Sequence, residues 1–172
     1  MLLGFTSLQF VPRKNLGFDV NGTSLMPVAK FLRTIPEDAL VCAFPARDAD
    51  NLAVLARRSM YIAREISHCL YQDYLKEIRR RTWIALAALS PVKGEPDLKP
   101  LEDEGVHYLV IRKARYREDE KAERHWKYDE PYASWLAART QPEQRMRYAK
   151  FWEDQGARKV YENHQFIVIN IL

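Results

Sequence analysis

The last seven residues of the chain, 166–172, constrain its fold more than any other segment. Their sequence is Phe-Ile-Val-Ile-Asn-Ile-Leu, and consecutive side chains of a strand point to opposite sides of a sheet. A strand with one side in water would alternate apolar with polar residues, and this segment does not. We therefore predict a strand inside a sheet, joined by a turn around Asn163 to a strand over 159–161, and required for folding.

The longest predicted helix covers residues 49–89, behind a cap at Asp48. This stretch has no Gly or Pro and repeats apolar residues at helical spacing. Its apolar side rotates by about a quarter turn in the second half, judged by the ~100° step of a helix. The helix therefore bends, breaks near residues 79–82, or packs its halves on different neighbours.

Shorter elements complete the predicted fold. Dense β-branched and aromatic residues predict further strands over 5–11, 39–44 and 106–112. Proline positions and capping residues predict shorter helices over 24–33, 131–139 and 140–155.

An irregular, acidic, proline-rich loop over about 90–105 interrupts this pattern. Strands are predicted on both sides of the loop, so we expect one domain over residues 1–172. The predicted fold class is α+β: a helix-rich single domain with a long central helix packed on a small, mostly antiparallel sheet. The composition agrees, because 47% hydrophobic and 29% charged residues are ordinary values for a globular chain.

The cysteines and the N-terminal residues indicate the cellular compartment in which the protein folds. Cys42 and Cys69 both lie among apolar residues, whereas a disulfide-based secreted domain usually has more cysteines in a shorter chain. Residues 1–12 lack the basic start and the small-residue cleavage site of a signal peptide. No apolar run approaches the ~18 residues that span a membrane. We expect a soluble, cytoplasmic protein with reduced thiols and no membrane partner.

Motifs for metal or cofactor binding are weak. Neither a dinucleotide-binding glycine motif nor a phosphate-binding loop occurs. Glu65 and His68 form a helical ExxH pair, but a di-iron site needs a second such helix and further carboxylates. The other match, Glu104 and His107, crosses from a loop into a strand. We expect no bound metal and no cofactor.

One enzymatic alternative comes from the acidic loop. Asp97, Lys99 and the carboxylates at 102–104 lie just before the strand at 106–112, where such groups can bind Mg²⁺ and position a phosphodiester. The residues are in a loop flanked by prolines rather than on strands that would hold their geometry. A metal-dependent phosphodiesterase or nuclease is therefore the third hypothesis.

The basic residues are the most informative feature. On the predicted long helix they share a narrow arc opposite the apolar stripe, and a second basic cluster follows the strand at 106–112. Guanidinium groups at helical spacing can contact successive phosphates, and an aromatic ring among them can stack on a base. The predicted nucleic-acid-binding residues are Arg57, Tyr61, Arg64, His68, Lys76, Arg79, Arg80, Arg81, Arg112, Lys113 and Arg115.

Two non-enzymatic hypotheses follow. The leading one is an accessory or adaptor protein that contacts nucleic acid or a nucleoprotein complex through the basic helix face, with low affinity and without sequence preference. Against it, a charged face is what any amphipathic helix needs, and the acidic loop can neutralise the same arginines internally. The alternative is a protein–protein interaction module, oligomeric or not, that uses exposed aromatic residues between 126 and 152.

Overall fold

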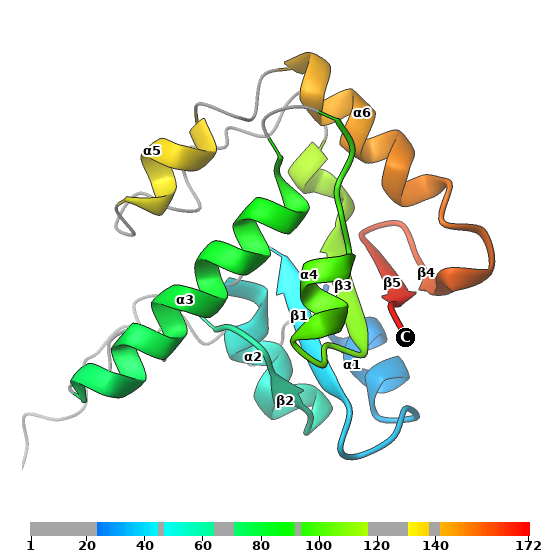
Figure 1. The fold of residues 1–172 in the computed structure, drawn as a ribbon. Helices are drawn as coiled ribbons and strands as arrows, with labels where there is room; N and C mark the ends of the chain where they lie inside the picture. Colours follow the sequence, from blue (N-terminus) through cyan, green and yellow to red (C-terminus); the bar gives the residue numbers. More distant parts are fainter. Residues whose placement is uncertain (1–23, 45–46, 64–70, 92–93, 117–130, 138–141) are drawn as a thin grey trace, which may run out of the picture.

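A mixed sheet with helices on both faces makes up the fold of the computed structural model (Figure 1). An α+β, helix-rich architecture is thereby confirmed. The strand predicted over 5–11 lies outside the described residues. The structure describes residues 24–44, 47–63, 71–91, 94–116, 131–137 and 142–172.

Five strands of the described residues form the sheet, in the order β2-β1-β3-β5-β4. They are β1 (Leu40–Phe44), β2 (Ser59–Met60), β3 (Tyr108–Arg112), β4 (Lys159–Glu162) and β5 (Phe166–Asn170). β1 pairs in parallel with β2 and β3, whereas β5 pairs antiparallel with β3 and β4. The prediction of a mostly antiparallel sheet is therefore wrong. Helices in the connections between β1, β2 and β3 supply the crossovers that parallel pairing requires.

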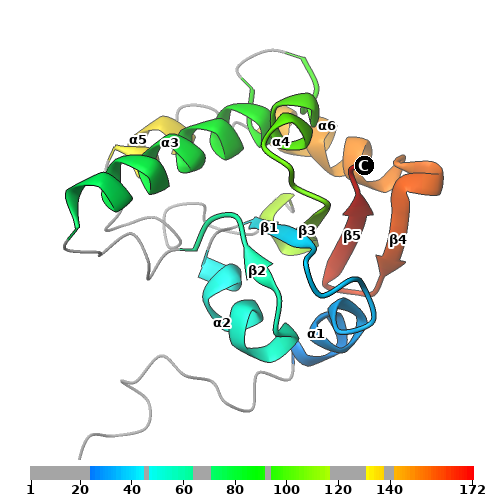
Figure 2. The ribbon, with the colours of Figure 1, turned by 60° about the horizontal axis from the view of Figure 1, so that its bottom comes forward.

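The helices form two layers (Figure 2). One face of the sheet is covered by α1 (Met26–Leu32) and α2 (Arg47–Ala56). The other is covered by α3 (Gln72–Leu89), α4 (Lys99–Asp103) and α6 (Pro142–Glu153), and α5 (Tyr132–Ala137) packs beside α3. Short 3-10 turns, η3 (Lys113–Tyr116) and η5 (Gly156–Arg158), follow β3 and precede β4. None of the helices in the described ranges is long and apolar enough to cross a membrane.

β5 shows why the last strand is apolar on both sides. Phe166 and Val168 pack against the α1–α2 layer, whereas Ile167 and Ile169 pack under the α3–α6 layer. The strand lies between β3 and β4, as the sequence predicted for an interior strand. β4, at the edge, carries a bulge between Lys159 and Tyr161.

The single helix predicted over 49–89 is wrong. α2 ends at Ala56, Arg57 adopts a left-handed conformation at φ 55°, and a short strand follows before α3 begins at Gln72. Contacts distant in sequence cause the break. The Tyr61 amide donates to the Val41 carbonyl at 2.8 Å, and the buried Arg58 guanidinium donates to the carbonyls of Arg33 and Ile35. Near residues 79–82, where a break was one of the options, α3 is continuous.

The loop predicted over 90–105 is irregular only in part. Residues Lys99–Asp103 form α4, with Pro100 in its first turn, where a missing amide hydrogen has no cost. The buried Leu101 anchors this helix in the core, and Gly105 follows it at φ 75°. The loop thus places the Glu104 carboxylate beside α3.

Candidate nucleic-acid interface

The predicted basic face is not one surface. Arg57 directly follows α2, on the side of the sheet opposite to α3. Tyr61 follows β2 and is only 1% exposed, so its ring offers no face to a base. Arg64 and His68 lie outside the described residues. Only Lys76, Arg79, Arg80 and Arg81 share α3.

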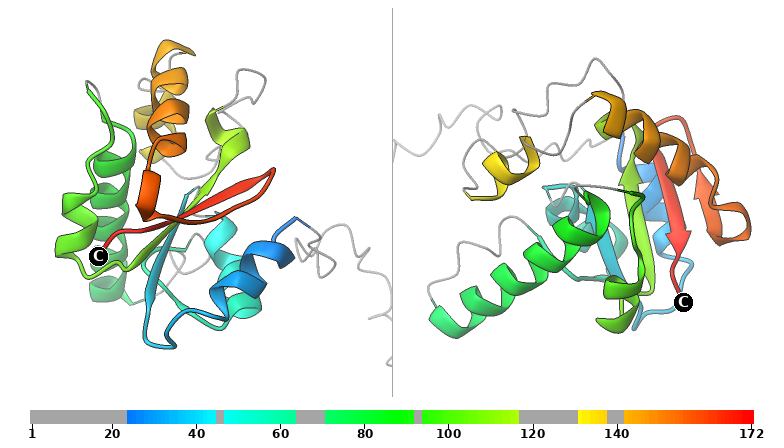
Figure 3. Two further views of the ribbon diagram at one scale, coloured as in Figure 1. Left: turned by 90° about the vertical axis from the view of Figure 1, so that its right-hand side faces the viewer. Right: turned by 45° about the horizontal axis from the view of Figure 1, so that its top comes forward.

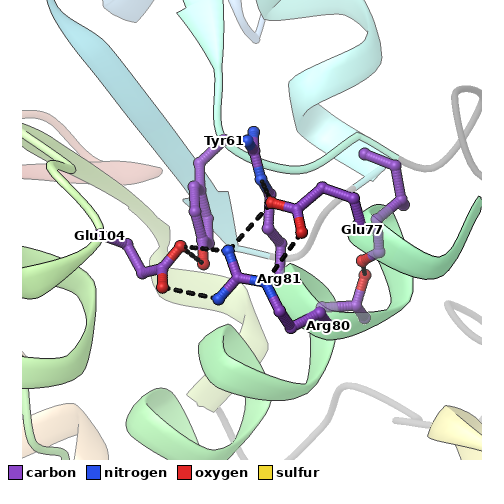
Figure 4. Close-up of polar contacts among 7 residues, drawn as sticks. Tyr61, Glu77, Arg80, Arg81 and Glu104 are labelled. Carbon is purple, nitrogen blue, oxygen red and sulfur yellow. Dashed lines mark hydrogen bonds and ion pairs between the residues drawn. The ribbon is translucent and has the colours of Figure 1, made fainter. Parts of the chain in front are cut away.

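Arg80 and Arg81 belong to a polar network between α3, α4 and the segment after β2 (Figure 4). Arg80 donates from Nη1 and Nη2 to the two Glu104 carboxylate oxygens, both at 2.6 Å, and from Nε to Glu77 Oε2 at 2.8 Å. Arg81 Nε donates to Glu77 Oε1 at 2.7 Å, and its guanidinium lies 5.4 Å from the Tyr61 ring centre. The Tyr61 hydroxyl donates to Glu104 at 3.2 Å. Both arginines are therefore neutralised internally.

The network shifts the acid–base properties of its members. Hydrogen bonds from Arg80 and Arg81 lower the pKa of Glu77 to about 2. The hydrogen bond from Arg80 also lowers the pKa of Glu104. Burial, followed by the charge of Glu104, raises the pKa of Tyr61. Both carboxylates therefore bind protons less readily in the folded protein than in the unfolded chain.

This difference predicts an acid-sensitive link between α3 and α4. A carboxyl group with a lowered folded pKa stabilises the fold above its unfolded pKa, and the contribution is lost as pH falls through the folded pKa. The contribution of Glu77 should therefore decline from its ordinary pKa of 4.5 towards about 2. We expect Glu77→Gln with Glu104→Gln to lower stability at neutral pH and to flatten its dependence on acid. Urea unfolding at a series of pH values tests this, and parallel pH profiles of parent and variant would contradict it.

The second predicted cluster is also paired. Arg112 binds Asp48 with two hydrogen bonds, Nε to Oδ2 at 2.8 Å and Nη2 to Oδ1 at 2.7 Å, and its guanidinium lies 4.8 Å from the Phe166 ring centre. Lys113 pairs with Glu162, which also contacts Lys159 at 2.6 Å. Arg115 lies in η3. Arg112 and Lys113 therefore link neighbouring elements rather than present free charge.

The Asp48–Arg112 pair occupies a notable place in the topology. β1 and β3 are adjacent parallel strands, and Asp48 and Arg112 lie at their carboxyl ends. In open α/β sheets, ligands bind in the crevice where the strand order reverses. Here the Asp48 carboxylate is buried and both of its oxygens accept hydrogen bonds from Arg112. The pair therefore has a structural role: it joins α2 to the end of β3.

One part of α3 keeps its cations on the surface. The N-terminal half of the helix projects beyond the sheet (Figure 3). Lys76 and Arg79 lie on this half, and both side chains are exposed. Lys76 contacts Asp73 at 3.1 Å, but these side chains are 75% and 97% exposed, and such pairs contribute little. Arg79 forms no ion pair with the part of the chain that the structure describes.

An aromatic residue continues the same stripe. Residues three, four and seven apart share one side of a helix, so Trp83 follows Lys76 and Arg79 along α3. Trp83 is partly buried and meets Tyr132 and Trp135 of α5. We call Lys76, Arg79 and Trp83 the α3 stripe. The spacing was available from the sequence, but the contact with α5 was not.

Asp97 and Asp103, two carboxylates of the nuclease hypothesis, serve local structure. Asp97 accepts a hydrogen bond from the Lys99 amide, and the Lys99 amine contacts Asp103 at 2.8 Å on the same short helix. His107 accepts a hydrogen bond from the Leu40 amide at 3.1 Å. Among the described residues, no three His, Cys, Asp or Glu side chains gather as a metal site.

An open hollow of about 570 Å³ lies between the loop after α3 and α6. Its charged residues are two cations and two carboxylates, so it has no charge preference. The lining residues are Gly94, Glu95, Arg147, Lys150, Phe151, Asp154 and Gln155.

No protein-family model matches the chain, and no curated protein is similar enough to be identified as a relative.

Proposed function

We propose that this is a cytoplasmic, non-enzymatic accessory protein that binds nucleic acid weakly and without sequence preference through the α3 stripe. The observation that supports this proposal is the exposure of Lys76 and Arg79 on one side of a projecting helix. Arg80, Arg81, Arg112 and Lys113 pair with carboxylates, so they add little to the field outside the molecule.

The expected contact is with the phosphate backbone. A cation that neutralises a phosphate releases a condensed counterion, so the affinity falls as salt rises. Two such contacts give a slope of the logarithm of affinity against the logarithm of salt of about −1.4 for a single strand or about −1.8 for a duplex. Backbone contacts carry no sequence information, so affinity should be the same for different sequences.

Reversing the charge of the stripe tests the proposal. We expect Lys76→Glu with Arg79→Glu to reduce oligonucleotide binding at low salt at least tenfold and to leave the fold intact, because both side chains are exposed. Fluorescence anisotropy with a labelled oligonucleotide over a salt series measures the affinity and its slope.

Lys30→Glu with Arg57→Glu is the matched control. This variant makes the same change in net charge on exposed residues of the α1–α2 layer, across the sheet from α3. We expect it to keep most of the parent affinity. Equal losses in the two variants would show only a dependence on net charge, and no loss in the stripe variant would overturn the proposal.

A further inference from the structure

The hollow between α6 and the loop after α3 carries charges of both signs that do not pair with one another. Arg147 and Lys150 of α6 line it, together with Asp154 and the loop residue Glu95. All four are exposed, and none of them forms an ion pair with any residue in the described ranges. By contrast, the network between α3 and α4 pairs its charges directly. The hollow therefore offers charges of both signs to a molecule that enters it.

These charges are separated along α6. Residues three, four and seven apart share one side of a helix, so Lys150 and Asp154 follow Arg147 on the side that lines the hollow. The Asp154 amide still donates to the Lys150 carbonyl, at 3.0 Å, so the helical path continues to this residue. At ~1.5 Å per residue, Asp154 lies about 6 Å from Lys150 and about 10 Å from Arg147 along the axis.

The helix itself strengthens this separation. The carboxyl end of a helix carries a partial negative charge, because its last carbonyl groups point away from the helix. Asp154 directly follows that end of α6. One side of the hollow therefore has a positive end and a negative end, which suits a ligand that carries an anion and a cation some distance apart.

The middle of the hollow is less polar. Phe151 lies between the two charged ends and packs with its inner side against the core. Gln155 lines the hollow next to it, and its Nε2 donates to the Phe151 carbonyl at 2.7 Å, which fixes the side chain. The volume of about 570 Å³ is within the range of small-ligand sites. The site has room for an apolar group between the two charges.

We propose that this hollow binds a short peptide of two or three residues with free amino and carboxyl ends. An extended chain covers ~3.3–3.6 Å per residue, so the ends of such a peptide lie about 7–10 Å apart, close to the separations along α6. A single amino acid carries both charges at one Cα and is too short to reach both ends. The peptide carboxylate contacts Arg147 and Lys150, and its ammonium group contacts Asp154. This site is distinct from the α3 stripe and does not depend on the proposed function.

The test is a nuclear magnetic resonance titration of the nitrogen-15-labelled full chain with the tripeptide Ala-Leu-Ala. We expect saturable shifts at the amides of Phe151 and Gln155, with a dissociation constant of about 1 mM or lower. Acetylation of the amino end together with amidation of the carboxyl end removes both charges. The capped peptide should bind about tenfold more weakly, the scale of one hydrogen bond to a charged group.

Arg147→Gln with Lys150→Gln removes the positive end of the hollow. We expect this variant to bind the free tripeptide about tenfold more weakly and to keep the fold, because both side chains are exposed. Lys76→Gln with Arg79→Gln is the matched control, since it makes the same chemical change on exposed residues of α3. The control should bind the tripeptide as the parent does.

Asp154→Asn tests the orientation of the peptide. We expect it to weaken binding of the free tripeptide and to leave binding of the peptide acetylated only at its amino end unchanged, because that peptide has no ammonium group to lose. Equal weakening of both peptides would overturn the proposed contact. Equal binding of free and capped peptides, or shifts confined to residues outside the hollow, would overturn the site. So would the absence of saturable shifts up to roughly ten times the expected dissociation constant.

Discussion

A chain truncated after Gln165 is expected to be unfolded or insoluble. The truncation removes β5, which pairs with β3 on one side and β4 on the other. The four consecutive side chains of residues 166–169 are each at most 1% exposed. Burial of each large apolar side chain contributes about 1.5–3 kcal/mol, so their sum is comparable to the ~5–15 kcal/mol that stabilises a domain.

Removal of Leu172 alone is the control for this truncation, because that side chain is 60% exposed and lies beyond β5. We expect its thermal midpoint to equal that of the parent. Circular dichroism and the soluble fraction after expression measure both variants. A soluble chain ending at Gln165 with an unchanged midpoint would mean that β5 is a detachable strand.

Asp48→Ala is expected to lower the free energy of unfolding by about 3 kcal/mol. The substitution leaves the Arg112 guanidinium, which is only 20% exposed, without its bidentate partner. Removal of one partner of a partly buried ion pair is strongly destabilising, and for a domain of this size the loss lowers the thermal midpoint by roughly 10 °C. Denaturant unfolding followed by circular dichroism measures the change.

Two further variants test this cause. Asp48→Ala combined with Arg112→Leu removes both charges and leaves an apolar side chain beside Phe166, so it should recover much of the loss. Asp73→Ala breaks the exposed contact with Lys76 and should change stability by less than about 0.5 kcal/mol. A double variant as unstable as Asp48→Ala would contradict the role of the broken ion pair.

Local sequence patterns correctly predicted the strands that are buried on both faces of the sheet. The apolar runs of β1, β3 and β5 identified these strands, because helices cover both faces of the sheet. The long helix was misjudged at residues 57–61, where spacing along the chain suits a helix but pairing with β1 prevails. The parallel half of the sheet was missed because strand direction depends on crossovers rather than on local sequence.

The candidate site could also be predicted only in part, because some of its contacts join residues that are distant in the sequence. Lys76 and Arg79 were identified correctly as exposed cations on a helix. The pairing of Arg80 with Glu104 was anticipated only as one alternative, since 24 residues separate them. Asp48 was interpreted as a helix cap, and its bond to Arg112 joins residues 64 positions apart. No local pattern encodes such a pair.

The interior position of β5 also sets an order of events during protein synthesis. β5 follows the other described strands in the chain, yet it lies between β3 and β4. On the ribosome, the sheet therefore stays divided until residues past Asn170 have emerged. Until then, one edge of β3 is unpaired, and both helical layers lack the apolar side chains of β5 that they pack against. Such exposed strand edges and apolar surfaces favour aggregation. The described sheet is thus completed only after β5 has been synthesised.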